Sequence, residues 1–205
     1  MMNTQTEATG NPAPTDQLGK AGTTVKEGVI SSLKGINEIE AEIVSLVRNT
    51  VSHTLHVTNT VATEAIGLTK EVVKGAILAT EEVGKGLVLS SKSVAKGVIL
   101  GVSDVGGDII SVARSTVTGA VKGAAEVGAD VAMVARRTVD GVIEATREVG
   151  GNVEEVAKVA VTGAIDAASS ISKTAVKAVK DMLVGVTESV KEVASAVVPK
   201  SKKAA

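Results

Sequence analysis

A repeat of fixed length, without insertions, runs through most of the chain and restricts what it can fold into. From Gly75 to Val198 the sequence divides into consecutive eleven-residue pieces. Eleven residues make three turns of a helix at about 3.67 residues per turn, so the repeat predicts an all-α protein. One series of glycines recurs every second piece, at Gly75, Gly97, Gly119, Gly141, Gly163 and Gly185. An apolar series has the same spacing, at Val83, Val105, Val127, Val149, Ile171 and Val193.

The repeat is amphipathic when it is placed on a helix. Successive positions lie about 98° apart, and positions 2, 3, 5, 6, 9 and 10 form a sector of small aliphatic residues. The opposite sector carries nearly all the charge, with acids frequent at position 8. Basic residues occupy position 7, at Lys92, Arg114, Arg136, Arg147, Lys158, Lys180 and Lys191. This pattern is typical of a helix that lies against an apolar surface, with its basic residues flanking the contact.

The apolar sector is the predicted contact surface, facing either lipid or a partner helix. It contains Val83, Val94, Val98, Val105, Ile109, Val127, Val131, Val142, Val149, Val153, Ile171 and Val193. Alternate pieces carry glycine at position 10, at Gly84, Gly106, Gly128 and Gly150. A fluid lipid surface has no reason to distinguish alternate pieces, whereas a partner helix approaches closely at small residues. These four glycines are therefore predicted to allow close helix approach, unless the alternation only records duplication of a 22-residue unit.

The sequence leaves two arrangements of the helices open. Three pieces end in glycine followed by a helix-capping residue, over 105–108, 127–130 and 149–152, which fits short helices folded back into a bundle. The eleven-residue phase passes through these points unchanged, which favours long, nearly continuous helices. We expect long 11/22-residue-repeat helices, bent or broken at Gly106-Gly107 and Gly150-Gly151, with the folded-back bundle as the alternative.

Composition excludes several classes of function. The 205 residues include no Phe, Trp, Tyr or Cys, and the net charge is −1. Stacking platforms and a positive field for nucleic acid are therefore absent, as are disulfides and thiolate chemistry. No secretory signal or spanning helix is recognisable, and we expect a cytoplasmic protein peripheral to a membrane or granule surface.

Three segments are predicted. Residues 1–24 are polar and without periodicity and are expected to be disordered, residues 25–198 form the amphipathic helical repeat region, and residues 199–205 form a short basic tail after the helix-ending Pro199.

No residue group predicts catalysis. His53 and His56 are spaced to share a metal on a helix, but no suitable third ligand accompanies them, so a solvent-edge pair is expected. The acids at position 8 repeat along a solvated face and predict salt bridges rather than paired catalytic carboxylates. We therefore expect no enzyme, no cofactor, no metal and no small-molecule substrate.

The chain resembles the synucleins and the wider set of eleven-residue amphipathic repeat proteins, which includes exchangeable apolipoproteins, perilipins and some late-embryogenesis-abundant proteins. The likeness rests on Val25-Lys26-Glu27-Gly28-Val29, on Thr69-Lys70-Glu71-Val72-Val73, and on the TVxG phrases over 116–119 and 138–141. The resemblance implies a chain that becomes helical on lipid surfaces.

Two functions follow as hypotheses. The first is a lipid-surface protein, a coat or stabiliser on a membrane or storage granule, whose many weakly binding repeats act together. The alternative is a self-assembling structural protein whose helices pack through small-residue contacts. The expected partner is accordingly a lipid surface, further copies of the chain, or both.

Overall fold

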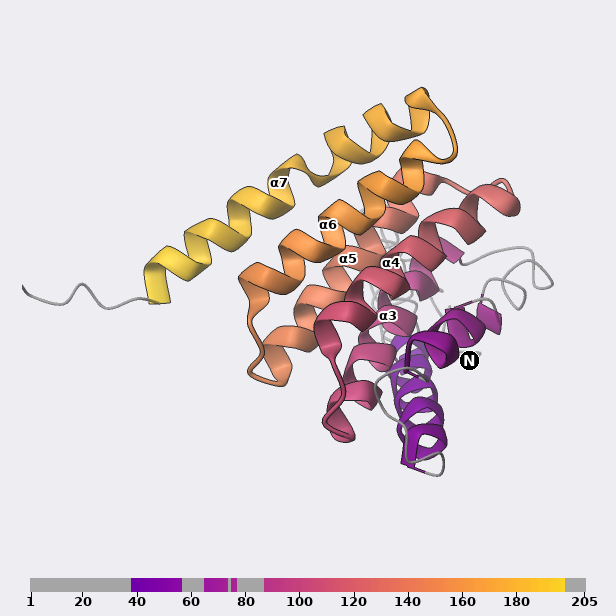
Figure 1. The fold of residues 1–205 in the computed structure, drawn as a ribbon, viewed down its shortest axis with the longest axis vertical. Coiled ribbons are helices and arrows are strands. Elements are labelled where there is room, and N and C mark those ends of the chain that lie inside the picture. The colour runs from indigo at the N-terminus through magenta and orange to yellow at the C-terminus, as the bar shows by residue number, and fades with distance from the viewer. Residues whose placement is uncertain (1–37, 57–64, 74, 77–86, 198–205) are drawn as a thin grey trace, which may run out of the picture. The chain divides into compact units, whose positions relative to one another are not determined.

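The computed structural model describes residues 38–56, 65–73, 75–76 and 87–197 (Figure 1). The side chains of residues 87, 89 and 187–197 are not described. By its contacts the chain divides into residues 1–39 and 40–205, and the account below concerns the second unit. The predicted terminal segments 1–24 and 199–205, Val83 and Gly84 lie outside the described residues.

All regular structure in the described part of the chain is helical, which confirms the all-α prediction. Residues 38–56, 65–73 and 75–76 are helical, and five further helices follow. These are α3 (Leu87–Asp104), α4 (Ile109–Glu126), α5 (Val131–Glu148), α6 (Val153–Ser169) and α7 (Lys173–Val197). From α3 to α6, each helix starts two eleven-residue pieces after the previous one, so each pair of pieces is one helix plus one turn.

Three turns between these helices share one backbone design. Gly106, Gly128 and Gly150 have positive φ, in the left-handed region that glycine adopts without steric cost. After α4, the Gly128 N–H donates to the Ala125 carbonyl (3.3 Å) and the Ala129 N–H donates to the Ala124 carbonyl (2.8 Å). This pair of bonds satisfies the last free carbonyls of the helix, as in a Schellman motif.

The residue before each following helix caps it. Asp108 accepts from the N–H groups of Ile110 and Ser111, Asp130 accepts from Met133, and Asn152 accepts from Glu155. A side-chain oxygen at this place satisfies N–H groups that have no partner within the helix. Together, the glycine and the cap end one helix and start the next within a few residues.

The helices fold back on one another, so the bundle alternative is confirmed and the long continuous helix is not what the chain forms. Each turn reverses the chain, and consecutive helices run in roughly opposite directions (Figure 1). Helices therefore contact both the next helix and the next but one. The most extensive contacts join α3 to α5 and α4 to α6. Breaks lie at both predicted glycine pairs, and also at residues 127–130 and 170–172.

The core is built from the same repeat positions in successive helices. Ala95, Val117 and Val139 occupy one such position and are each 0 % exposed. A turn further on in each helix come Ile99, Val121 and Ile143, which are also buried. The apolar sector of the repeat is thus turned inward and covered by neighbouring helices.

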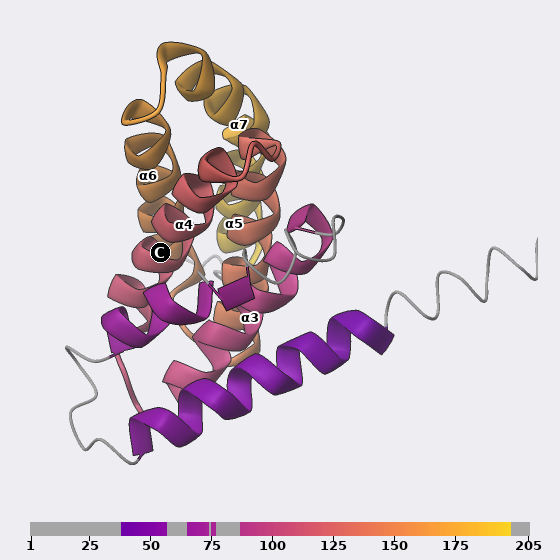
Figure 2. The same cartoon turned by 90° about the vertical axis from the view of Figure 1, so that its right-hand side faces the viewer.

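The first described helix joins the same core. It lies across α3, in indigo in Figure 2. Its Val51 and Leu55 extend the two buried rows and are each 1 % exposed. The apolar register of the regular repeats therefore continues into this earlier part of the chain.

Among the described residues, none of the helices combines the length and the apolar character needed to cross a membrane.

Candidate functional site

The surface that distinguishes this chain is the contact between helices two apart, and glycines shape it. Gly97 of α3 lies so close to the first described helix that a Cβ there would be 2.7 Å from the Val47 Cβ and 2.9 Å from the Val44 carbonyl oxygen. One turn on, a Cβ at Gly101 would lie 2.7 Å from the Arg48 carbonyl oxygen. Real Cβ atoms do not approach so closely, so these positions require glycine.

The same contact recurs further along the bundle. A Cβ on Gly141 of α5 would overlap the Lys92 carbonyl oxygen of α3. In the next repeat, a Cβ on Gly163 of α6 would lie 3.2 Å from the Arg114 carbonyl oxygen of α4. Arg114 follows Lys92 by the same interval as Gly163 follows Gly141. Small residues let two helices approach until their backbones touch, and the chain uses this device repeatedly.

The glycines singled out from the alternation have a different role. A Cβ on Gly106, Gly128 or Gly150 would meet no atom within 4 Å, and all three residues sit in the left-handed turns. They end helices rather than admitting neighbours, which corrects the prediction of close approach at these positions. The close approaches described above lie within helices instead, at Gly97, Gly101, Gly141 and Gly163, where glycine costs about 1 kcal/mol in helix propensity relative to alanine.

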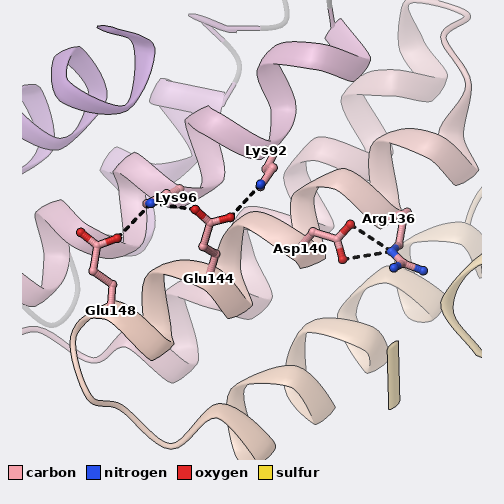
Figure 3. Close-up of polar contacts among 6 residues, drawn as sticks. All are labelled: Lys92, Lys96, Arg136, Asp140, Glu144 and Glu148. Atoms are coloured by element: carbon pink, nitrogen blue, oxygen red, sulfur yellow. Dashed lines mark hydrogen bonds and ion pairs between the residues drawn. The ribbon is translucent and has the colours of Figure 1, made fainter. Parts of the chain in front are cut away.

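An ion-pair network crosses the contact between α3 and α5 (Figure 3). The Lys92 Nζ lies 2.7 Å from a Glu144 carboxylate oxygen, and the Lys96 Nζ lies 2.8 Å from the other. Lys96 also lies 2.9 Å from Glu148. Hydrogen bonds from Lys92 and Lys96 hold the pKa of Glu144 below its ordinary value, and the bond to Glu144 raises the pKa of Lys96.

One ion pair of this network recurs in the next repeat. The Arg114 Nη2 lies 2.7 Å from an Asp166 carboxylate oxygen, joining α4 to α6. Arg114 and Asp166 occupy the positions that Lys92 and Glu144 hold one repeat earlier. A basic residue on one helix thus meets an acid on the helix two further along.

The other predicted basic residues lie in three settings. Arg136 is half-buried, donates to Asp140 in its own helix (3.0 Å) and reaches the Met182 carbonyl of α7 (3.3 Å). Arg147, Lys158 and Lys180 are exposed and form no ion pair among the described residues. The Lys191 side chain is not described.

A bidentate pair joins the first described helix to α3. The Arg48 Nε and Nη2 donate to the two carboxylate oxygens of Asp104, both at 2.7 Å. The Arg48 hydrogen bonds lower the pKa of Asp104, and the Asp104 carboxylate raises the pKa of Arg48. Two parallel hydrogen bonds fix orientation as well as distance.

The predicted contact residues divide between the interior and the helix ends. Val94, Val98 and Val142 are buried in the core. The half-buried members are Val105, Ile109, Val127, Val131 and Val153. Val149 and Ile171 are exposed (36 % and 38 %) and lie in turns, and the Val193 side chain is not described. The predicted apolar face therefore serves mainly to bind the helices to one another.

One small cavity among the described residues is lined by the helical residues 65–73 and 75–76 and by α3, α4 and α5, and it has room for about one water molecule. The hydroxyls of Ser91, Thr116 and Thr138 belong to its lining residues, and each donates to a carbonyl of its own helix. His53 and His56 are exposed, and no group of metal-ligating side chains forms among the described residues.

The residues that sequence reasoning missed are the mid-helix glycines Gly97, Gly141 and Gly163 and the acids Glu144 and Asp166. The sequence does contain a signal for them, because the glycines and the two acids recur at multiples of 22 residues. A glycine retained in the middle of a helix against its propensity indicates a close packing contact. What the spacing could not give was the pairing of each helix with the helix two further along.

Comparison with known proteins finds no match to the chain among protein-family models, curated proteins or solved structures.

Proposed function

We propose that this chain is a non-enzymatic structural protein, a scaffold of short helices that works by packing helix against helix. The observation that carries the proposal is the direction of the apolar face. Val98 and Val142, expected to contact lipid or a partner, are 0 % exposed inside the bundle. A surface that is already covered within the chain leaves the outer, mixed-charge faces to meet the surroundings.

The glycine contacts support the same proposal. Backbone-to-backbone approach at Gly97, Gly141 and Gly163 fits only one neighbour at one register, whereas a fluid lipid surface has no such shape. Ion pairs placed at equivalent positions of successive repeats add to this specificity. The chain is therefore built for defined helix–helix contacts.

Lipid binding is the second candidate, and the composition of the core favours it. The apolar core consists of aliphatic side chains, chiefly Val and Ala, which bury little area per residue. Opening the bundle at its turns would return a complete apolar stripe to each helix, as lipid-surface helices require. This function needs the bundle to come apart.

Circular dichroism of the purified full chain tests the proposal, with and without vesicles of phosphatidylcholine or of phosphatidylcholine with phosphatidylglycerol. The scaffold proposal expects a helical protein that melts cooperatively, and that vesicles leave unchanged. A coil that becomes helical only on vesicles would overturn it in favour of the lipid coat.

A cross-linked variant sharpens this test, because the chain has no cysteine of its own. A Cβ on Gly119 would lie 3.9 Å from the Val73 Cβ, a separation that suits a disulfide. The double change Val73→Cys and Gly119→Cys would tie the helix at 65–73 to α4. If lipid binding requires opening, the reduced form binds vesicles in a flotation assay and the oxidised form does not. If neither form binds, the scaffold proposal stands.

A further inference from the structure

The turn between α6 and α7 is built from residues that a helix can contain. After α4 and α5, the residue that follows the C-cap is Gly128 or Gly150, and its positive φ ends the helix. After α6, the C-cap is Ser170 in a right-handed conformation, and Ile171 follows it. A β-branched residue strongly disfavours positive φ. The α6–α7 turn therefore lacks the glycine that ends the earlier helices.

The backbone hydrogen bonds of this turn are already close to those of a helix. The Ser172 N–H donates to the Ala168 carbonyl (3.2 Å), four residues earlier, as in an α-helix. The Ile171 N–H donates to the same carbonyl (3.0 Å), with the spacing of a 3₁₀ turn. The Ser172 hydroxyl then accepts from the Ala175 N–H (3.0 Å) and starts α7 as a separate helix. To straighten the turn, the N–H groups of residues 173–175 need only bond to the carbonyls four residues before them.

A straight helix from α6 into α7 has one continuous apolar face. Ala157 and Val179 are 22 residues apart, as are Ala164 and Val186, and all four side chains are buried. Because 22 residues make six turns at about 3.67 residues per turn, the two pairs share one face. Ile171 follows Ala164 by seven residues and belongs to the same face, yet it is 38 % exposed in the turn. The turn thus leaves uncovered an apolar residue that a straight helix places among buried ones.

The contact of α7 with the bundle is an incomplete copy of the contacts before it. Gly141 lets α5 approach the backbone of α3, whereas a Cβ on Gly185, the equivalent residue of α7, would meet no atom within 4 Å. Among the described residues, no ion pair of the kind that joins α3 to α5 reaches α7. Val179 and Leu183 of α7 are at most 2 % exposed, and α7 contacts α5 and α6. α7 is therefore bound by apolar burial, without the backbone contact that fixes α5 on α3.

We propose that the α6–α7 turn is a hinge that straightens, and that two copies of the chain exchange α7 through it. Opening the hinge uncovers the apolar face of α7 and the surface that it covered on α5 and α6, which is unfavourable for a single chain. That surface fits an α7 helix, and a second copy of the chain supplies an identical one. When each α7 packs on α5 and α6 of the other copy, the buried contacts are restored and only the turn has changed.

The exchanged pair has a defined geometry. α6 of one copy lies antiparallel to α7 of the other, as α6 and α7 do within one chain (Figure 1). The two hinges meet at the two-fold axis, where each Ile171 lies on the apolar face of its straight helix and faces the other copy. Reciprocal exchange closes on itself, so it produces a dimer and no larger assembly.

This inference rests on the proposed scaffold function and names its partner, a second copy of the chain. Size-exclusion chromatography with light scattering tests it on the full chain, after incubation just below the melting midpoint at rising concentration. Monomer and dimer are expected, with the dimer fraction growing with concentration and no larger species. A chain that stays monomeric up to several hundred micromolar would overturn the inference and leave the scaffold proposal in place, because that proposal is judged by the melting and vesicle measurements.

Two variants of the turn should shift the dimer equilibrium in opposite directions. Ser172→Ala removes the cap of α7 in both chains and favours helix through the turn, so the dimer dissociation constant should fall at least about tenfold. The double change Ser172→Gly and Thr174→Asp copies the glycine and cap found 22 residues earlier, at Gly150 and Asn152. It should raise the dissociation constant at least about tenfold, because the glycine again ends the helix.

Asn152→Ala is the matched control for the loss of a cap. It removes the cap of α6 but keeps the left-handed Gly150 before it, so it should lower stability without strengthening the dimer. If Ser172→Ala dimerises no more tightly than the wild type, or if Asn152→Ala strengthens the dimer as much, the α6–α7 turn is not the hinge.

A distance within one chain distinguishes exchange from any other dimer. Lys158→Cys and Val184→Cys place spin labels at exposed positions of α6 and α7, and the chain has no other cysteine. In the closed turn these positions lie level on neighbouring helices, whose axes are about 10 Å apart. In a straight helix the 26 residues between them span about 39 Å.

Pulsed electron–electron resonance measures this distance on labelled chains diluted with an excess of unlabelled chain, so that only pairs of labels within one chain contribute. The dimer fraction is expected to show the long distance and the monomer fraction the short one. A dimer that shows only the short distance would mean that closed chains associate through another surface, which overturns the exchange of α7.

Discussion

Helices α5 and α6 carry the same repeat but end up in different surroundings. In α5, Val139 and Ile143 are buried, and α3, α4, α6 and α7 all contact the helix. In α6, the equivalent Val161 and Ile165 are only partly buried, and the described helices that contact it are α4, α5 and α7. The same repeat position is therefore covered to different extents in different helices, so truncating it should cost more in α5 than in α6.

The turn that follows α6 also differs from the turns between the earlier helices. The three turns from α3 to α6 use a left-handed glycine and a following Asp or Asn cap. The turn from α6 to α7 has Ser170 in a right-handed conformation, and its Ser172 hydroxyl accepts from the Ala175 N–H. The end of the array has thus lost both the extra packing and the standard turn, which is typical of terminal repeats.

Replacing a buried isoleucine and a partly buried one by alanine should give the largest difference in the free energy of unfolding. Ile99 is 0 % exposed. Ile99→Ala should therefore lower the free energy of unfolding by about 4 kcal/mol. Ile165 is only partly covered. Ile165→Ala should cost about 2 kcal/mol, because fewer contacts are lost.

Urea denaturation followed by circular dichroism measures both losses. Equal losses would mean that α6 is as well covered as α3.

Two glycines of the same repeat series, Gly141 and Gly185, should show the next largest changes in the free energy of unfolding when replaced by alanine, and the two changes should have opposite signs. Gly141→Ala places a Cβ against the Lys92 carbonyl oxygen, a backbone atom that cannot move without separating α3 from α5. We expect a loss of about 2–3 kcal/mol. A Cβ on Gly185 in α7 meets no atom within 4 Å. Gly185→Ala should therefore gain up to about 1 kcal/mol from helix propensity.

Thermal melting of both variants shows whether Gly141→Ala is less stable and Gly185→Ala more stable than the wild type. A stabilised Gly141→Ala protein would contradict the close contact between α3 and α5.

Turn glycines should respond differently from helix glycines. A Cβ on Gly128 meets no steric obstacle, but the residue has positive φ. Because this conformation disfavours any residue with a Cβ, Gly128→Ala should lose about 1 kcal/mol. Gly185→Ala is again the control, because it makes the same change within a helix. If both variants gained stability, residue 128 would have to continue the helix, as in the arrangement of long continuous helices.

The ion pairs should contribute least, and only over part of the pH range. Because the pKa of Glu144 is lowered in the folded chain, its contribution is present above the ordinary value of 4.5 and is lost as pH falls through the folded-state value. The Glu144 side chain is close to half exposed. Glu144→Gln should therefore cost less than about 1 kcal/mol at neutral pH.

The same variant should show a shallower loss of stability below pH 4.5 than the wild type, when urea midpoints are measured across pH. Glu126→Gln, an exposed carboxylate with no ion pair among the described residues, is the matched control. An unchanged pH profile in Glu144→Gln would show that the pair does not form in solution.

Much of the local structure could be predicted from the sequence. The eleven-residue spacing predicts helix, and glycine followed within two residues by Asp or Asn marks where helices end, at 105–108, 127–130 and 149–152. These signals act over a few residues, through backbone conformation and capping hydrogen bonds, so they do not depend on distant parts of the chain. The amphipathic face could likewise be identified, since it follows from helical geometry alone.

The choice between one long helix and a folded stack could not be made in this way. A helix such as α4 and the turn that follows it together span two eleven-residue periods, so the apolar phase is unbroken in both arrangements. Folding back is favoured because each helix buries its apolar face against its neighbours, a gain that exists only once those neighbours are in place.

By itself, then, the sequence of this protein determined helices, their amphipathic face and the glycine-containing points where α3, α4 and α5 end. Only the tertiary structure decided that the face is turned inward, that Gly141 rather than Gly128 admits a neighbouring helix, and that Glu144 meets Lys92. The reason is physical: conformation and capping are set by adjacent residues, whereas burial and ion pairing depend on which helices lie side by side.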